Sequence, residues 1–488
     1  MRRRYPALLL VVAAFVAIVV TARSTVDADV PNFSTAAEGW MPSAPASTSL
    51  TETWFCPGVP ASGVEEVEGE IVIANRDAER LVGTILLVND QRETRSLDLA
   101  IDGWSSARLD LDETLPGSMV GAVIEIDGGG AVVEQLAFHP SGDSVSACAN
   151  ATSDAWYLAD GFTVEGSLDQ VVMMNPYEQT VVVNLEFATQ EGSRRPASYR
   201  GLTVPAQSIR VVDLGAPGAG AQNEPVLAVK VETTRGRLVV GRSQRFLGGG
   251  RLGTQVTLAS PELRDQWWFA DGAKGPGVSE RFSIYNPTAE AVEVDVIFLG
   301  VELPDDGSDF DRVAAVAADP IEVPPREVVT FDPGPQADLP EGRHATVFST
   351  LAQPSVVVER AMTRIVDDVV ATSVIAGATP RQDGHVATTW HLASGPSEPV
   401  TEGLVVYNAD NSPGFVSVLA VGRSGPVPID GLQDVEVGPA GVAAIDLTDP
   451  LVIDRELIVE STTRVFVERS FPTGRGDTRS SSWAVPAG

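Results

Sequence analysis

Basic residues are scarce in this chain. It contains 34 Lys and Arg residues against 66 Asp and Glu residues, a formal net charge of −32, and Lys230 and Lys274 are its only lysines. No compact basic run follows the N-terminus to offset this balance. Nucleic acids and anionic lipid headgroups bind basic surfaces, so the composition argues against both as partners.

Histidine is equally rare, and the common catalytic motifs are missing. The four histidines are scattered and form no HExxH pattern, and no CxxC pattern occurs. The chain also has no GxSxG nucleophile elbow and no phosphate-binding Walker loop. Metalloproteins and hydrolases use such spacings to bring ligands or reacting groups together. We therefore expect no enzymatic activity, no cofactor and no metal site.

The N-terminus carries an export signal. Residues 1–22 form a membrane anchor or signal segment, because three arginines at positions 2–4 precede an uncharged apolar run. The basic flank predicts that the remainder is extracytoplasmic. The run is short for a membrane span and long for a signal core, and the weak cleavage sites after it favour an uncleaved anchor. Residues 23–50, rich in Ser, Thr, Ala and Pro, are typical of a flexible stalk.

A hexapeptide organises the rest of the chain. WWFADG (267–272) has close relatives in WYLADG (156–161) and WHLASG (390–395), and a degenerate copy in TWFCPG (53–58). Each copy is followed by a hydrophobic segment that ends in asparagine, for example VVMMN (171–175). Asn and the Pro that follows it in two copies are residues with which a chain leaves a strand and turns. The pattern predicts one structural unit used four times.

Each copy contains about seven short stretches with period-two alternation, separated by turn residues. This pattern predicts an all-β fold of four tandem immunoglobulin-like antiparallel β-sandwich modules, after one N-terminal transmembrane or signal helix. The expected modules lie at 51–153, 154–263, 264–382 and 383–488.

The order of these motifs resembles a tandem repeat of bacterial secreted proteins. The third copy carries nearly all of it, through Trp267, Gly272, Asn286-Pro287, Pro324 and VVVERAM (356–362). Over residues 51–488 the chain resembles an actinobacterial family of uncharacterised membrane-anchored or secreted envelope proteins with immunoglobulin-like or fibronectin-like repeats. The resemblance implies a sandwich fold and an exported location. The resemblance implies no particular activity and identifies no catalytic residues.

The hexapeptide aspartates have two interpretations, a catalytic acid or a residue at a strand end. Asp160 and Asp271 both stand at the fifth position of the hexapeptide, but Pro57 and Ser394 occupy this position in the other copies. Neither replacement can do the work of a carboxylic acid, and no second carboxylate recurs at a fixed offset. We therefore interpret both aspartates as strand-end residues beside a turn glycine.

The hexapeptide tryptophans also allow two interpretations. Exposed, the rings would be ligand-binding aromatics that stack on sugars; buried, they would close a sandwich or fill a joint between adjacent modules. Their place at each module entrance favours the joint. The candidates are Trp156, Trp267, Trp268 and Trp390.

A Glu-Arg pair ends a late strand in two copies. The pairs are Glu359-Arg360 and Glu468-Arg469, and the other copies have Glu134-Gln135 and Gly241-Arg242. Successive residues of a strand face opposite ways, so one pair cannot form a single charged cluster. We expect structural ion pairs with neighbouring strands.

The two cysteines both fall in the first copy. Cys56 lies in the opening hexapeptide and Cys148 in the last strand of the module. First and last strands can be neighbours in a sandwich, and an exported chain is oxidised, so we predict a disulfide between them.

Two loops are weaker candidate sites. Asp305, Asp306, Asp309 and Asp311 could supply oxygen ligands to Ca²⁺, but a solvated hairpin loop is the favoured interpretation because their spacing is not that of an EF-hand. The tripeptide Arg475-Gly476-Asp477 has the form of an integrin-type adhesion motif.

These observations predict a non-enzymatic, membrane-tethered rod of β-sandwich repeats at the cell envelope. Its role would be structural, adhesive or protein-binding, with an envelope protein or polysaccharide as partner and the membrane touched only by the N-terminal helix. The alternative is a carbohydrate-binding accessory protein that acts on envelope or extracellular polysaccharide.

Overall fold

Antiparallel strands make up almost all of the described chain, as the period-two alternation predicts. The computed structural model describes residues 41–488 except 64–65, 302–313, 351–352, 381–385 and 475–477. Buried and partly exposed residues alternate along β11 (Val181–Thr189), because successive side chains face opposite sides of a sheet. The expectation of an all-β, antiparallel fold is confirmed.

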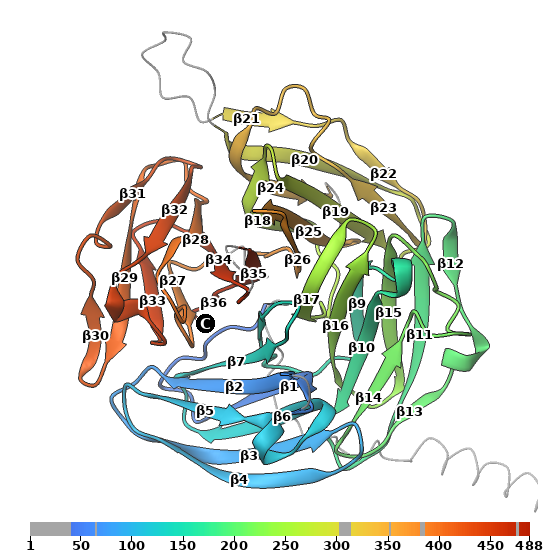
Figure 1. Ribbon diagram of the computed structural model, residues 1–488, viewed down its shortest axis with the longest axis horizontal. Coiled ribbons are helices and arrows are strands. Elements are labelled where there is room, and N and C mark those ends of the chain that lie inside the picture. Colours follow the sequence, from blue (N-terminus) through green and yellow to red (C-terminus); the bar gives the residue numbers. More distant parts are fainter. Residues whose placement is uncertain (1–40, 64–65, 302–313, 351–352, 381–385, 475–477) are drawn as a thin grey trace, which may run out of the picture. The chain divides into compact units, whose positions relative to one another are not determined.

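The strands form eight sheets, which we group as four repeats by their order along the chain (Figure 1). Repeat 1 consists of β1 (Thr51–Ala61), β2 (Glu68–Asn75), β3 (Leu81–Asn89), β4 (Thr94–Ile101), β5 (Ser106–Asp110), the short helix α2 (Leu111–Thr114), β6 (Gly117–Asp127), β7 (Ala131–Phe138) and β8 (Ser144–Ala147). Repeat 2 consists of β9 (Ala155–Gly161), η1 (Val164–Gly166), β10 (Leu168–Asn175), β11, β12 (Gly192–Arg194), η2 (Ala197–Tyr199), β13 (Leu202–Val204), β14 (Ser208–Asp213), β15 (Leu227–Arg235), β16 (Val239–Gly248) and β17 (Arg251–Leu258).

The second half of the chain repeats this order. Repeat 3 consists of β18 (Gln266–Lys274), β19 (Val278–Asn286), β20 (Val292–Val301), β21 (Ala314–Ala317), β22 (Ile321–Val323), β23 (Glu327–Phe331), β24 (Gly342–Ser349), β25 (Val357–Val366) and β26 (Val369–Ala376). Repeat 4 consists of β27 (Thr389–Leu392), β28 (Val400–Asn408), β29 (Gly414–Gly422), β30 (Gly425–Pro428), β31 (Val435–Val437), β32 (Val442–Leu447), η3 (Pro450–Val452), β33 (Leu457–Ser461), β34 (Val465–Pro472), β35 (Arg479–Trp483) and β36 (Val485–Pro486).

Two sheet patterns recur in every repeat. The sheet that contains the hexapeptide has the order β1-β6-β3-β4 in repeat 1 and β18-β24-β20-β21 in repeat 3. The other sheet has the order β5-β2-β7-β8 in repeat 1 and β23-β19-β25-β26 in repeat 3. The described residues nevertheless belong to one compact unit, Ala36–Gly488, so the division into four domains at the expected boundaries stays a prediction.

The recurring asparagine explains why each repeat turns at the same place. Asn75, Asn175, Asn286 and Asn408 are all buried, and each side-chain amide donates to backbone carbonyls on two different segments. For Asn175 the acceptors are the carbonyls of Gln179, Val204 and Pro205, at 2.7, 3.1 and 2.8 Å. One buried amide thus satisfies backbone groups that would otherwise lack partners, and it holds the turn against the later strand.

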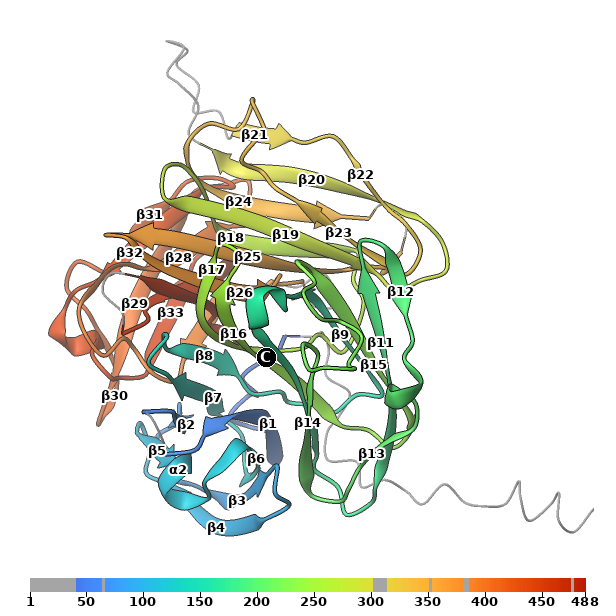
Figure 2. The same cartoon turned by 45° about the vertical axis from the view of Figure 1, so that its right-hand side comes forward.

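Four strands near the ends of the repeats, β8, β17, β26 and β35, lie next to one another. β17 contacts β8 and β26, and β35 contacts β26 and β8, so these strands form a closed cycle (Figures 1 and 2). The segment before β1 joins the end of repeat 4, because Ala44 donates to the Pro486 carbonyl at 2.8 Å and accepts from the Gly488 amide at 2.8 Å. Where the strands meet, a cavity of about 50 Å³ is lined by residues of every repeat, including Val145, Val256, Ile375 and Trp483.

Candidate functional site

The first tryptophan of each hexapeptide is buried inside the core. Trp156, Trp267 and Trp390 are at most 1% exposed. Their indole Nε1 atoms donate to backbone carbonyls at the start of the next-to-last long strand, those of Leu238, Val356 and Val465, at 3.0, 3.0 and 2.8 Å. Burial with a satisfied N–H is the usual place of a structural tryptophan. None of these three rings is available to stack on a sugar.

Trp268, the second tryptophan in its hexapeptide, lies at a contact between repeats 3 and 4. Its ring stacks on Tyr407, with centroids 5.6 Å apart, and on Phe466, with centroids 5.5 Å apart. Tyr407 lies at the end of β28 and Phe466 at the start of β34, both in repeat 4. This ring therefore fills a joint between two repeats. Of the two interpretations of the tryptophans, a sugar-stacking ring and a joint, the joint is the one that the sequence position favours.

Asp160 lies in a buried polar network between repeats 2 and 3. Its carboxylate binds Arg251 of its own repeat at 2.5 Å and accepts from Ser283 of repeat 3 at 2.6 Å. Burial alone would raise the pKa of Asp160, but Arg251 and Ser283, with help from Arg242, hold it below its usual value. Asp160 is fully buried, and its carboxylate is held by Arg251 and Ser283.

Asp271 occupies the equivalent place between repeats 3 and 4. Its carboxylate binds Arg364 at 2.6 Å and also binds Arg343. Burial would raise the pKa of Asp271, but Arg364, Arg343 and Arg360 lower it below its usual value. Asp160 is next to last in β9, whereas Asp271 lies inside β18, at the register shift between Phe269 and Gly272. The strand-end position expected for both aspartates is therefore found only for Asp160, and both take part in ion pairs near the joints.

Buried Arg–Glu pairs link one repeat to the next. Arg242 of repeat 2 binds Glu359 of repeat 3 at 2.9 Å, and Arg360 of repeat 3 binds Glu468 of repeat 4 through both carboxylate oxygens. The third pair joins Arg469 of repeat 4 to Glu134 of repeat 1, with Nη2–Oε1 at 3.0 Å and Nη1–Oε2 at 3.1 Å. All six side chains are at most 1% exposed.

Two of these glutamates, Glu359 and Glu468, also bind the hexapeptide of the preceding repeat. Glu359 Oε2 accepts from the backbone amides of Ala159 and Asp160, at 2.9 and 2.5 Å, and Glu468 Oε2 accepts from the amide of Asp271 at 3.1 Å. A buried carboxylate is tolerated when a cation and several hydrogen-bond donors satisfy it. The expected structural ion pairs therefore exist, but their partners lie in neighbouring repeats.

The contact between repeats 1 and 2 lacks such a pair. Gln135 stands in the arginine column of repeat 1, and Gly241 stands in the glutamate column of repeat 2. A Cβ atom at Gly241 would lie 2.7 Å from Cγ of Pro57, so the hexapeptide proline of repeat 1 takes up the space of the missing side chain. The cation and the anion of the Arg–Glu pair are thus both replaced by uncharged residues at this joint.

The pair between repeats 4 and 1 closes the series of contacts. Arg76 of repeat 1 donates to His391 Nε2 of repeat 4 at 3.0 Å, and Arg108 of repeat 1 donates to Ser394 Oγ of repeat 4 at 2.5 Å. An extended rod would keep its first and last repeats apart. The rod expected from the sequence is therefore wrong, because repeat 4 contacts repeat 1 directly.

Two buried glutamates near this closing contact make it sensitive to pH. Burial raises the pKa of Glu52 to about 7 and that of Glu456 to about 8, and Arg76 offsets the rise only in part. Glu52 accepts one hydrogen bond, from the Ala131 amide at 3.0 Å, while neither carboxylate oxygen of Glu456 has a partner among the described residues. Near neutral pH the folded chain therefore holds protons that the unfolded chain, with a glutamate pKa of 4.5, releases.

We expect the folded chain to lose stability as the pH rises from about 5 to about 8, by at most about 1.4 kcal/mol per pH unit for each raised carboxyl group. The stabilisation is fully present below the unfolded pKa and disappears as the pH passes the folded pKa. Glu456→Gln is neutral at every pH and should make the decline shallower. Urea unfolding at unit pH steps measures this, with the exposed Glu232→Gln as control. An unchanged slope in Glu456→Gln would contradict the expectation.

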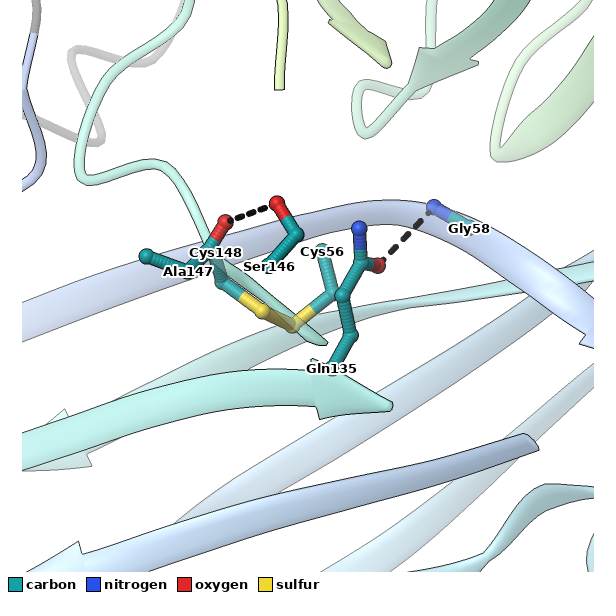
Figure 3. Close-up of a disulfide and its surroundings, with 6 residues drawn as sticks. All are labelled: Cys56, Gly58, Gln135, Ser146, Ala147 and Cys148. Carbon is teal, nitrogen blue, oxygen red and sulfur yellow. Dashed lines mark hydrogen bonds between the residues drawn. A yellow bond between two sulfur atoms is a disulfide. The ribbon is translucent and has the colours of Figure 1, made fainter. Parts of the chain in front are cut away.

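The disulfide is confirmed. Cys56 and Cys148 are bonded, with Cα atoms 4.5 Å apart, and both are fully buried (Figure 3). The bond joins β1 in one sheet of repeat 1 to the segment directly after β8 in the other. Beside it, Gln135 Oε1 accepts from the Gly58 amide at 3.3 Å. A disulfide favours an oxidising, extracytoplasmic environment for this part of the chain.

Several candidate features lie outside the described residues. They are the anchor or signal segment at 1–22, most of the stalk, the acidic loop with Asp305, Asp306, Asp309 and Asp311, and the tripeptide Arg475-Gly476-Asp477. Within the part of the chain that the structure describes, no helix is long and apolar enough to cross a membrane. Within the same residues, no three His, Cys, Asp or Glu side chains are grouped to hold a metal ion.

Residue Trp104 of repeat 1 was not singled out by sequence reasoning. It lines a cleft of about 250 Å³ between repeats 1 and 4, together with Arg423, Arg455 and Glu456 of repeat 4. A signal was present in the sequence. The equivalent turn residues of the other repeats are Gln207, Arg326 and Ala440, so a tryptophan is exceptional there.

Residues 132–246 match the model of DUF5719, a family of unknown function. The match runs from β7 of repeat 1 to β16 of repeat 2 and so includes the contact between these repeats. No curated protein sequence matches the chain.

Two solved structures show a weak similarity to the chain. One is Thermotoga maritima 1070, at 16% identity over 18% of this chain and 80% of that chain, with a TM-score of 0.17. The other is a tetra-tandem repeat in the extending region of a large adhesion protein, at 12% identity over 85% of this chain and 94% of that chain, with a TM-score of 0.12. At such TM-scores neither similarity supports an argument about fold or function.

Proposed function

We propose that this protein is a non-enzymatic, extracytoplasmic component of the cell envelope with a structural, adhesive or protein-binding role. In this proposal four immunoglobulin-like sandwich modules form one closed unit, which residues 1–22 tether to the membrane. The observation that carries it is the series of buried Arg–Glu pairs between repeats 2 and 3, 3 and 4, and 4 and 1. Such pairs fix the repeats relative to one another, so the loops of different repeats can bind a partner together.

The burial of the hexapeptide groups supports a non-enzymatic role. Asp160 and Asp271 are at most 1% exposed and are already bound by arginines. A general acid or base must reach its substrate and exchange a proton with it. The disulfide between Cys56 and Cys148 supports the extracytoplasmic location.

Cross-linking on intact cells tests the location and the role. The full chain, carrying an epitope tag, is treated with a membrane-impermeant cross-linker and recovered under denaturing conditions. We expect it to carry an envelope protein or an envelope polysaccharide. Recovery of uncross-linked protein from the cytosol would contradict the proposal. Release of soluble fragments from isolated envelope by the purified protein, abolished in Asp160→Asn or Asp271→Asn, would contradict a non-enzymatic role.

A further inference from the structure

A cleft lies where repeat 4 meets repeat 1, and its walls differ in chemistry. Repeat 1 contributes the segment 104–106, which contains Trp104 and two serines, and repeat 4 contributes the segments 421–423 and 454–456. The volume is about 250 Å³. Most of the lining is polar, with Trp104 and Val421 as its apolar side chains, so the polar groups around the cleft determine which ligand would fit it.

The fold of repeat 1 does not require a tryptophan at this turn. Trp104 has a φ of 55°, and the equivalent residues Gln207, Arg326 and Ala440 have φ values of 43°, 58° and 44°. The left-handed turn is thus a constant of the repeat, and other copies make it with small or flexible side chains. A bulky residue is disfavoured in this conformation, so the indole in repeat 1 needs another explanation.

The turn presents the indole at the cleft. The Trp104 amide donates to the Asp77 carbonyl at 2.8 Å, and the buried Asn75 amide donates to the Asp102 carbonyl at 3.0 Å. On the other side, a Cβ atom at Gly425 of β30 would lie 3.8 Å from the indole, an ordinary van der Waals distance, so the ring lies next to repeat 4. Trp104 is partly buried, and these contacts fix the position of its turn.

The repeat 4 side of the cleft carries two guanidinium groups, those of Arg423 and Arg455, beside the carboxyl groups of Asp454 and Glu456. Arg423 and Arg455 are exposed, and neither forms an ion pair among the described residues. Asp454 is nearest to a different arginine, Arg108, at 3.9 Å.

A buried carboxyl group completes the cleft. Glu456 is 4% exposed, lines the cleft, and has no hydrogen-bond partner for either carboxylate oxygen among the described residues. A buried polar group without a partner costs free energy, which a ligand hydroxyl group can recover by binding to it.

We propose that this cleft binds an acidic sugar, a pyranose ring that carries a carboxylate. The C–H face of the ring stacks on Trp104, as apolar faces pack on indoles. Arg423 and Arg455 bind the carboxylate, since the planar guanidinium matches carboxylate geometry. Glu456 binds a ring hydroxyl group. This inference deepens the proposed function by naming a ligand class. It rests on that function only for the location, the cell envelope, where the protein would encounter the ligand.

Calorimetric titration of the full chain with the trisaccharide of galacturonic acid tests the site. We expect binding that weakens as salt is added, and much weaker binding of the neutral galactose trisaccharide or of inorganic phosphate. Trp104→Ala should lower the affinity by about tenfold or more, as should Arg423→Gln with Arg455→Gln. The turn tolerates alanine, since Ala440 occupies it in repeat 4.

Arg326→Ala is the matched control, because it changes the same turn in repeat 3, away from the cleft, and should leave the affinity unchanged. Three results would overturn the inference: no binding of the acidic trisaccharide, equal binding of the neutral one, or full affinity in Trp104→Ala with an unchanged circular dichroism spectrum. A failed titration would not affect the cross-linking result expected for the proposed function. Recovery of the protein from the cytosol would not affect the titration, so the two proposals can fail separately.

Discussion

Replacing Glu468 with glutamine is expected to lower the free energy of unfolding by about 3 to 5 kcal/mol, because it leaves the guanidinium of Arg360 buried without its counter-charge. Burial on its own lowers the pKa of Arg360, but Glu468, with Glu280 and Asp271, raises it, so this arginine is charged in the folded chain. The variant also weakens the hydrogen bond to the Asp271 amide. Both partners are fully buried, so water cannot replace what is lost.

Urea unfolding followed by tryptophan fluorescence measures the loss. Glu232→Gln is the matched control, because it makes the same chemical change in an ion pair whose glutamate side chain is 54% exposed, and it should cost about 1 kcal/mol or less. The double variant Arg360→Met with Glu468→Leu should recover most of the lost stability, since no charge is then left buried. A loss in Glu468→Gln as small as in the control would show that this pair does not hold repeats 3 and 4 together.

The sequence predicted the directions in which the paired Glu and Arg side chains point, but not their partners. Glu359 and Arg360 are adjacent, so alternation along the strand turns them to opposite sides, and the structure places Glu359 against repeat 2 and Arg360 against repeat 4. The partners could not be named, because they lie 117 and 108 positions away and local pattern says nothing about such distances. The aligned Glu-Arg positions of the repeats contained one hint. Repeat 1 lacks the arginine, at Gln135, and the next repeat lacks the glutamate, at Gly241, as expected if the arginine of one repeat pairs with the glutamate of the next.

The candidate sites show the same limit. Comparing the copies argued against a catalytic role for Asp160 and Asp271, and turn chemistry identified the recurring asparagines. Both arguments use only neighbouring residues or equivalent positions of the repeats. Closure of repeat 4 onto repeat 1 depends on how the four repeats pack against one another, and tandem repeats in a sequence are compatible with a row as well as with a closed series. The cleft at Trp104 is formed by that closure, so it could not be predicted from the sequence.

Reduction of the disulfide is expected to lower the free energy of unfolding of repeat 1 by about 4 kcal/mol, because the bond closes a long loop in the unfolded chain. Cys56 and Cys148 are 92 positions apart, so that loop includes nearly all of repeat 1. The bond also joins the two sheets of this repeat. Urea unfolding with and without dithiothreitol measures the effect at constant sequence, and the change should appear in the transition of repeat 1.

Cys56→Ala with Cys148→Ala separates the loss of the cross-link from other effects of the reductant. This variant should unfold at the lower urea concentration and no longer respond to dithiothreitol, apart from a small additional loss from the two buried side chains it shortens. Repeat 1 supplies Glu134 to the pair with Arg469, so the contact with repeat 4 should weaken in the same transition. Identical unfolding curves for the oxidised and reduced chain would show that the bond, although formed, does not stabilise the repeat that closes the series.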